Sequence, residues 1–228
     1  FDELGKKSVA VTINSESYSK RELGIAKKVA EEIGIRHEIV SLSQLDDTDY
    51  VKNTADRCYF CKKGEMAEMR VVAERFGFKH VAFGVNTSDF GEYRPGLKAL
   101  QEDGDFRPLV DAELEKKEIV QLAEFLGLSN HDLPSTTCLS SRIPYGQTIT
   151  ASKLSQIEEA ELMLENLGIR QSRVRNYGKL ARIEVSPQEI EKVVANRKTI
   201  VSKLKELGFL YITLDLEGYR SGSMNDVL

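Results

Sequence analysis

The chain has no tryptophan, few prolines and no hydrophobic run near the roughly 18 residues that a membrane-spanning helix requires. It also has no excess of basic charge, because 32 lysines and arginines face 36 acidic residues for a net charge of −4. These absences argue against a membrane protein, a low-complexity chain and a globally basic nucleic-acid binder. The 228 residues, 41% hydrophobic and 30% charged, have the composition of one large or two modest globular domains.

Cysteine is scarce as well, and three is an odd number for a disulfide framework. The first five residues (FDELG) lack the basic and apolar regions of a signal peptide. We therefore expect a cytoplasmic protein, with no membrane partner, whose cysteines serve something other than disulfides.

Strand and helix patterns alternate through the first half of the chain. Apolar, β-branched runs at 8–13, 36–42 and 80–85 predict strands. Helices are predicted between them, one from the capping box of Ser19 and Glu22 to Gly34 and one from about residue 62 to Gly77. This order predicts a parallel sheet, which binds ligands at the carboxyl ends of its strands. Asn14 and Asp89 follow strands there and are candidate ligand residues, although plain turns would look the same.

The periodicity is lost between residues 133 and 146, which we interpret as a domain junction. Beyond it the sequence predicts a helix ending at Gly168, strands at 172–177 and 179–185 joined by Gly178, a helix over 186–208 and a strand at 209–215. We therefore predict an α/β domain with a parallel sheet over 1–135, a junction loop over 136–149 and a small α+β domain over 150–228.

The cysteines form a C-x-x-C pair, Cys58 and Cys61, and a distant third residue, Cys138. The pair lies where a helix is predicted to begin, and the helix dipole there favours thiolates. Three thiolates could bind zinc with His131 as a fourth ligand, or three irons of a 4Fe-4S cluster with the fourth iron open. A redox pair or plain buried cysteines are equally compatible with the pattern.

A basic cluster occurs in the second half of the chain, with no acid before Glu184: Arg170, Arg173, Arg175, Lys179 and Arg182. Because side chains alternate along a strand, Arg173 and Arg175 share one face. Their planar guanidinium groups suit a phosphate or carboxylate between them, although a solvated sheet face is the simpler alternative. Three more arginines lie on irregular segments and are further anion candidates: Arg94, Arg142 and Arg220.

Four separated motifs, in order along almost the whole chain, resemble the LarE family of ATP-dependent sulfur transferases, which belong to the PP-loop ATP pyrophosphatases. The motifs are YRPGLKA at 93–99, CLSSRIPYG at 138–146, RVR at 173–175 and GYRSG at 218–222. The family acts in the synthesis of the nickel-pincer nucleotide of lactate racemase.

The resemblance implies a reaction and its participants. With ATP and Mg²⁺, the enzyme would adenylate a carboxylate of pyridinium-3,5-biscarboxylic acid mononucleotide and release pyrophosphate, and sulfur would then displace AMP. In members with a single cysteine at the position of Cys138, that residue gives up its sulfur and becomes dehydroalanine. The additional Cys58 and Cys61 resemble a branch in which three cysteines hold a 4Fe-4S cluster carrying a replaceable sulfide.

The resemblance also assigns four arginines to positions around the substrate phosphate, AMP and pyrophosphate: Arg142, Arg173, Arg175 and Arg220. Glu161 matches an acidic pocket residue of the family, and Ser141 and Asp89 match further site positions. It also implies that 1–135 is a PP-loop-type nucleotide-binding domain and that 150–228 serves substrate binding and oligomerisation, so we further expect a homo-oligomer. The family's PP-loop, Ser-Gly-Gly-x-Asp-Ser, does not occur in the sequence and would belong before the strand at Ser8. Either the chain lacks the first βα unit of the PP-loop domain, which we expect, or the protein does not bind ATP in the way of the family.

Two other functions fit parts of the sequence. A PP-loop tRNA thiolase also uses a C-x-x-C pair and a third cysteine, but its nucleic-acid partner would require a broad basic surface that a net charge of −4 argues against. A zinc-stabilised binding module would use the three cysteines and His131 and would catalyse nothing. Iron with acid-labile sulfide would exclude the zinc alternative.

Overall fold

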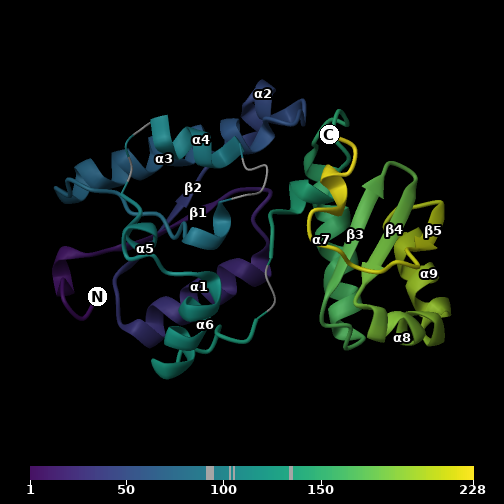
Figure 1. The fold of residues 1–228 in the computed structure, drawn as a ribbon. Helices are drawn as coiled ribbons and strands as arrows, with labels where there is room; N and C mark the ends of the chain where they lie inside the picture. Colours follow the sequence, from purple (N-terminus) through teal and green to yellow (C-terminus); the bar gives the residue numbers. More distant parts are fainter. Residues whose placement is uncertain (91–94, 103, 105, 134–135) are drawn as a thin grey trace. The chain divides into compact units, whose positions relative to one another are not determined.

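The computed structural model describes residues 1–90, 95–102, 104, 106–133 and 136–228 (Figure 1). The chain forms two compact units. The first contains Phe1–Tyr50 and Asp56–Ser135, and the second contains Val51–Ala55 and Thr136–Leu228. The chain therefore passes between the units at three points. None of the helices in the described part is long and apolar enough to cross a membrane.

The first unit is built on two parallel strands, β1 (Ala10–Asn14) and β2 (His37–Ser41), joined by helix α1 (Lys20–Ile33). The α1 boundaries agree with the sequence prediction. The Ser19 hydroxyl accepts a hydrogen bond from the Glu22 amide, and Gly34 ends the helix at a φ of 73°, which favours glycine. Figure 1 shows α3 and α4 on one side of the strand pair and α1 on the other. This arrangement confirms a mixed α/β fold with a parallel sheet.

The remaining elements of this unit are helical. They are α2 (Thr48–Val51, whose last residue belongs to the second unit), α3 (Arg57–Phe76), α4 (Pro95–Glu102), α5 (Pro108–Asp111) and α6 (Lys116–Phe125). Helix α3 packs against α4 and buries Met66, Ala99 and Leu100 between them. It begins at Arg57, five residues before the predicted start, so the C-x-x-C pair lies in its first turns.

The strand predicted at 80–85 is wrong. Among the described residues this segment forms only an isolated parallel bridge, between Ala82 and Phe106. Phe83 donates its amide to the carbonyl of Phe106, and Phe106 donates its own amide to Val81. The pairing stops there because Pro108, two residues later, has no amide hydrogen and begins helix α5.

The second unit contains a mixed three-stranded sheet. Strand β3 (Ser172–Tyr177) pairs antiparallel with β4 (Leu180–Val185), and β4 pairs parallel with β5 (Tyr211–Leu214). Helix α7 (Ala151–Asn166) precedes the sheet. The single helix predicted over 186–208 is divided into a 3-10 turn (Pro187–Glu189), α8 (Ile190–Ala195) and α9 (Arg197–Glu206), with a break at Asn196.

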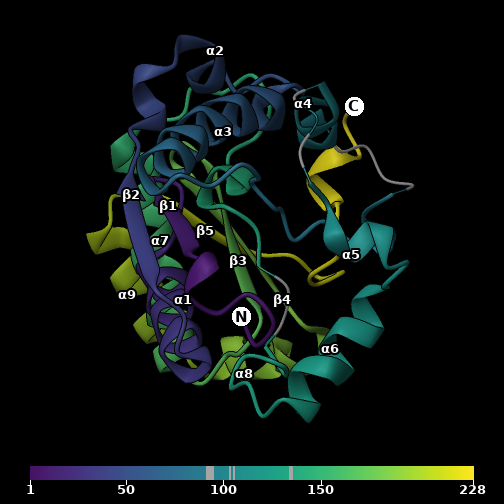
Figure 2. The same cartoon turned by 90° about the vertical axis from the view of Figure 1, so that its left-hand side faces the viewer.

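The two faces of this sheet differ in chemistry. Val174, Ala181 and Ile183 face the helices and are 0 to 1% exposed in a core with Leu164 and Leu204. Figure 2 shows α7 and α9 on one side of the sheet and the C-terminal segment on the other. The arginines that alternate with Val174 therefore lie beneath the C-terminal segment rather than in the apolar core.

Candidate functional site: a buried arginine cluster and a thiol pair

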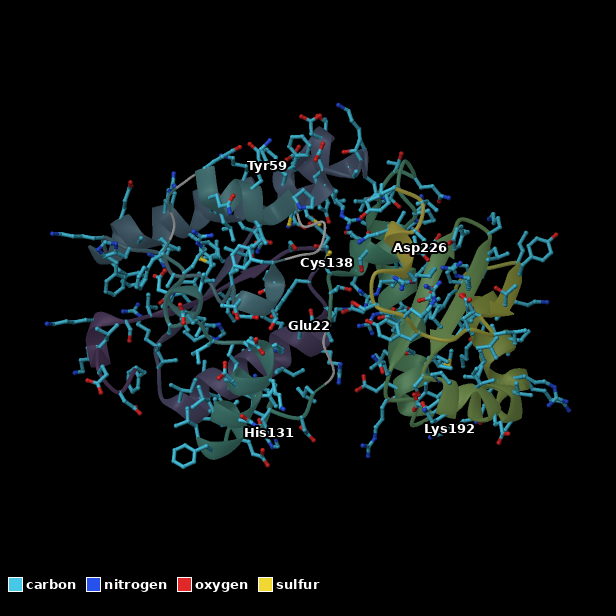
Figure 3. The ribbon with its side chains drawn as sticks, in the orientation of Figure 1. Glu22, Tyr59, His131, Cys138, Lys192 and Asp226 are labelled. Carbon is cyan, nitrogen blue, oxygen red and sulfur yellow. The ribbon has the colours of Figure 1, made fainter. Side chains whose placement is uncertain are left out.

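Cys138 lies in the second unit, directly before the 3-10 helix Leu139–Arg142 (Figure 3). Arg142 organises this loop. Its Nη1 donates to the carbonyl oxygens of Thr137 (2.7 Å) and Cys138 (3.0 Å) and to the hydroxyls of Thr137 (2.7 Å) and Ser141 (2.9 Å). We refer to residues 137–142 as the cysteine loop.

Glu161 of helix α7 holds Arg142 from the other side. Nε and Nη2 of Arg142 donate to the two carboxylate oxygens of Glu161 at 2.9 and 3.0 Å, a bidentate pair. The Arg142 side chain is 3% exposed and that of Glu161 16%. The same carboxylate accepts the backbone amide of Val174 on β3 at 2.9 Å. Glu161 thus joins the cysteine loop to the sheet, which sequence periodicity alone does not reveal.

Arg173 and Arg175 lie on β3, and both are buried rather than solvated. Arg175 donates from Nη2 to Glu184 at 2.6 Å and from Nη1 to the carbonyl of Ser141 in the cysteine loop at 3.1 Å. Arg182, opposite Arg175 on β4, also donates to Glu184. Arg173 donates to the carbonyl of its neighbour Ser172 and lies over the ring of Tyr219, with Cζ 5.0 Å from its centroid.

The arginine cluster consists of the buried Arg142, Arg173 and Arg175 and the partly exposed Arg182, whose side chain is 30% exposed. Burial lowers the pKa of Arg173, and the nearby Arg142 and Arg175 lower it further against the opposing effects of Glu161 and Tyr219. Nε of Arg175 is buried and has no hydrogen-bond partner among the described residues. A buried N–H donor beside crowded cations is satisfied best by an anion.

The thiol pair lies in the first unit, in the opening turns of α3. None of the three cysteines forms a disulfide. Nη2 of the buried Arg57 lies 3.6 Å from the Cys58 Sγ. Cys61 accepts a hydrogen bond from Nε2 of Gln44 at 3.0 Å, and its Sγ lies 3.3 Å from a carboxylate oxygen of Glu65. Both cysteines are half-buried, and their thiols have polar neighbours.

The other predicted site residues have separate surroundings. Asn14 is the last residue of β1, and its carbonyl accepts the amide of Leu42 after β2. Asp89 caps a short 3-10 helix (Thr87–Asp89) by accepting the backbone and side-chain N–H groups of Asn86. Arg220 is exposed and pairs with Glu217 and Asp226, and these pairings raise its pKa. Arg94 lies outside the described residues.

A three-residue metal site is not assembled within either unit as described. No group of three or more His, Cys, Asp or Glu among the described residues is placed to hold a metal ion. Cys58, Cys61 and His131 belong to the first unit and Cys138 to the second. The ligand set of the cysteines therefore stays a prediction.

Several residues of these sites were not expected from the sequence. Glu184 could have been found, because a hairpin turning at Gly178 places it opposite Arg173. Tyr219 lies within the GYRSG motif, in which only Arg220 was predicted as a site residue. Gln44 and Arg57 carry no local signal, since their role depends on how the chain folds back on the thiols.

Comparison with known proteins gives the chain a family. The fold and the arginine cluster define a mixed α/β protein, and no family model matches it. Pyridinium-3,5-bisthiocarboxylic acid mononucleotide synthase of Lactiplantibacillus plantarum is 38% identical over 229 residues, which cover 100% of this chain and 83% of that protein. The chain therefore belongs to the family of this synthase, the LarE family.

Two further relatives have no assigned function. An uncharacterised protein of Synechocystis is 42% identical over 100% of this chain and 86% of its own length. An uncharacterised protein of Methanocaldococcus jannaschii is 34% identical over 75% of this chain and 67% of its own length. The similarity thus extends over both units of the chain.

Proposed function

We propose that the chain is an ATP-dependent sulfur transferase. It would adenylate a carboxylate of pyridinium-3,5-biscarboxylic acid mononucleotide and replace AMP with sulfur, in the synthesis of the nickel-pincer nucleotide. The observation that carries the proposal is the 38% identity, over the whole chain, with a synthase named for the bisthiocarboxylic acid product. A carboxylate oxygen is a poor leaving group, and adenylation converts it into AMP, which sulfur can displace.

The arginine cluster supports the substrate assignment. A mononucleotide substrate carries a phosphate, and AMP carries another. The planar donors of Arg173 and Arg175 suit a phosphate, and the buried Nε of Arg175 has an N–H to offer. In this proposal Arg142 acts differently, because it holds the cysteine loop beside these arginines through the contacts to Thr137 and Cys138.

The cysteines support the proposed sulfur source. Cys58 and Cys61 lie one turn apart on α3, form no disulfide and are each half-buried, and thiolates are the ligands that iron–sulfur clusters require. We propose that they bind a 4Fe-4S cluster together with Cys138. When bound, the cluster would supply the replaceable sulfide that displaces AMP. The three thiols themselves would remain unaltered, so that the protein can act repeatedly.

The reaction is tested directly, in the protein with its PP-loop present, under anaerobic conditions with substrate, ATP, Mg²⁺ and sulfide. We expect pyrophosphate, AMP and a product in which sulfur has replaced oxygen, at more than one product per chain and with the protein mass unchanged. Omission of ATP or sulfide serves as the control. A single product per chain with dehydroalanine at position 138 would contradict the cluster as sulfur source while leaving the reaction intact.

The metal is tested separately by analysis of anaerobically purified protein. We expect iron, acid-labile sulfide and a broad absorption band near ~400 nm, which stands out in a chain without tryptophan. Serine in place of Cys58, Cys61 or Cys138 should each abolish the band. Zinc without sulfide would favour the binding module instead, and an unchanged band in all three variants would exclude these ligands.

A further inference from the structure

The side chain of Gln44 bridges the turn after β1 and the thiol pair. Gln44 is the first residue of a 3-10 turn (Gln44–Asp46) that follows β2, and it is 4% exposed. Its side-chain oxygen accepts the hydroxyls of Ser17 at 2.6 Å and Ser15 at 3.2 Å, both in the turn after β1. Its Nε2 donates to Sγ of Cys61 at 3.0 Å.

The amide has little freedom to turn. Two hydroxyls converge on the oxygen, which leaves the N–H groups for the sulfur. The backbone also fixes the residue, because the Gln44 amide donates to the carboxylate of Glu16 at 3.1 Å and the same carboxylate accepts the hydroxyl of Ser43. A donor held this firmly costs little ordering entropy when it bonds to a neighbouring sulfur.

We propose that Gln44 is a positioning residue for Cys61. It fixes the sulfur at the carboxyl ends of β1 and β2 and donates a hydrogen bond to it when the sulfur binds iron. The part of this inference that involves iron rests on the proposed function. The hydrogen bond between Gln44 and Cys61 rests on the geometry alone. Hydrogen bonds to ligating sulfurs set the reduction potential of a cluster, and donors behind metal ligands typically contribute 10- to 100-fold in metal affinity.

The hydrogen bond itself is tested in the reduced, metal-free protein by NMR of the glutamine side-chain amides. We expect Cys61→Ala to shift the Gln44 amide signals, because it removes the acceptor. Cys58→Ala is the matched control, since Cys58 makes no hydrogen bond with Gln44 among the described residues, and should leave these signals in place. Gln44 signals that stay unchanged in Cys61→Ala would overturn the proposal whether or not the protein binds iron.

The effect on the cluster is tested in the iron-loaded protein with Gln44→Leu and Gln44→Glu. Leucine keeps the bulk but removes the donor, and glutamate replaces the donor with a charged acceptor. We expect both to lower the reduction potential, glutamate more than leucine, and to speed iron loss to a chelator by about tenfold or more. Gln121→Leu, on the exposed surface of α6, is the control and should behave like the parent.

The NMR experiment and the cluster measurements distinguish failure of the positioning role from failure of the proposed function. If the parent protein takes up no iron and sulfide, the proposed cluster is wrong, while the NMR result still decides whether Gln44 holds Cys61. If the parent binds a cluster and both Gln44 variants keep its potential and iron retention, the positioning role is wrong and the proposed function stands.

Discussion

Arg142 shows how one residue can hold a cysteine-bearing loop in place. Its Nε and both terminal nitrogens are engaged by Glu161, by two backbone carbonyls and by two hydroxyls. The resemblance to LarE proteins suggested a direct contact with substrate or nucleotide. The structure shows that Arg142 also holds the loop that carries Cys138 to the helix behind it, and the contact with substrate or nucleotide stays a prediction.

We therefore expect Arg142→Ala to lower the free energy of unfolding by about 3 kcal/mol or more, because it leaves Glu161 as an uncompensated, largely buried charge. Arg142→Lys should recover only part of this loss, since a single ammonium group cannot replace the bidentate pair. Urea unfolding of the variants measures it. Lys203→Ala removes the exposed pair with Glu206 and should leave the free energy of unfolding nearly unchanged. Equal losses in both would contradict the anchoring role.

Arg173 provides the matching test of anion binding. We expect Arg173→Ala to weaken binding of AMP or the pyridinium mononucleotide by roughly tenfold or more, because a charge-assisted hydrogen bond contributes about 1.5–3 kcal/mol. Arg173→Lys should rescue poorly, since it keeps the charge and loses the fork. Titration calorimetry measures both. Arg197→Ala, on the exposed side of α9, is the control. Parent-like binding by both Arg173 variants would place the phosphate elsewhere.

At the scale of elements, the β3–β4 hairpin was the most predictable part of the chain. Alternation placed Arg173 and Arg175 on one face and Val174 on the other, and Gly178 adopts the positive φ of 74° that the turn requires. Burial of the arginines was not predictable, because it depends on the C-terminal segment, whose Ser223 contacts Arg175 from 48 residues away in sequence.

The wrong strand prediction at residues 80–85 has a different cause, which is the lack of a pairing partner of similar length in the described part of the chain. Its apolar, β-branched run is typical of a strand, but a strand requires a partner of similar length. The described partner is the single residue Phe106, hydrogen-bonded on either side to Val81 and Phe83. Local pattern predicts the tendency of a segment to extend. It cannot predict whether another segment is available to pair with it.

Glu189 links two elements of the second unit and gives a pH-dependent prediction. Burial would raise its pKa, but the amides of Arg170 and Gln171 and the hydroxyl of Ser186 donate to the carboxylate and lower the pKa overall. A carboxylate with a lowered pKa stabilises the fold above its unfolded-state pKa and loses that contribution as the pH falls through its folded-state value.

We therefore expect Glu189→Gln to cost about 1 kcal/mol at neutral pH, because the amide cannot accept all of these hydrogen bonds. The difference from the parent should shrink in acid, where the parent carboxylate becomes protonated. Urea unfolding at pH values above and below the ordinary glutamate pKa measures it. A difference that stays constant across that range would show that the carboxylate charge plays no part.

At the scale of the whole molecule, the second unit is not continuous in sequence. Residues Val51–Ala55 belong to it although they precede most of the first unit. Asn53 is fully buried, and its Nδ2 donates to the carbonyls of Ile143, Pro144 and Gln147. Its φ of 55° lies in the left-handed region. No motif marks this segment in the sequence, because its partners lie about 90 residues away.

We expect Asn53→Ala to destabilise the protein by about 2 kcal/mol or more, through unsatisfied carbonyls and a strained backbone. Asn53→Gly relieves the strain and should cost about 1 kcal/mol less. Hydrogen exchange at the amides of Gly146 and Ile149, which donate to Asn53 and Val51, should speed up in both variants. Unchanged exchange at these amides would mean that the segment is not held by Asn53.

The early position of this segment has a consequence during synthesis on the ribosome. Asn53 is translated 94 residues before Gln147, the last carbonyl that its side chain binds. At typical rates of about 5 to 20 residues per second, the segment waits roughly 5 to 20 seconds for its partners. During that interval the nascent chain holds Val51–Ala55 unpaired between parts of the first unit, and the second unit closes only after the cysteine loop has been made.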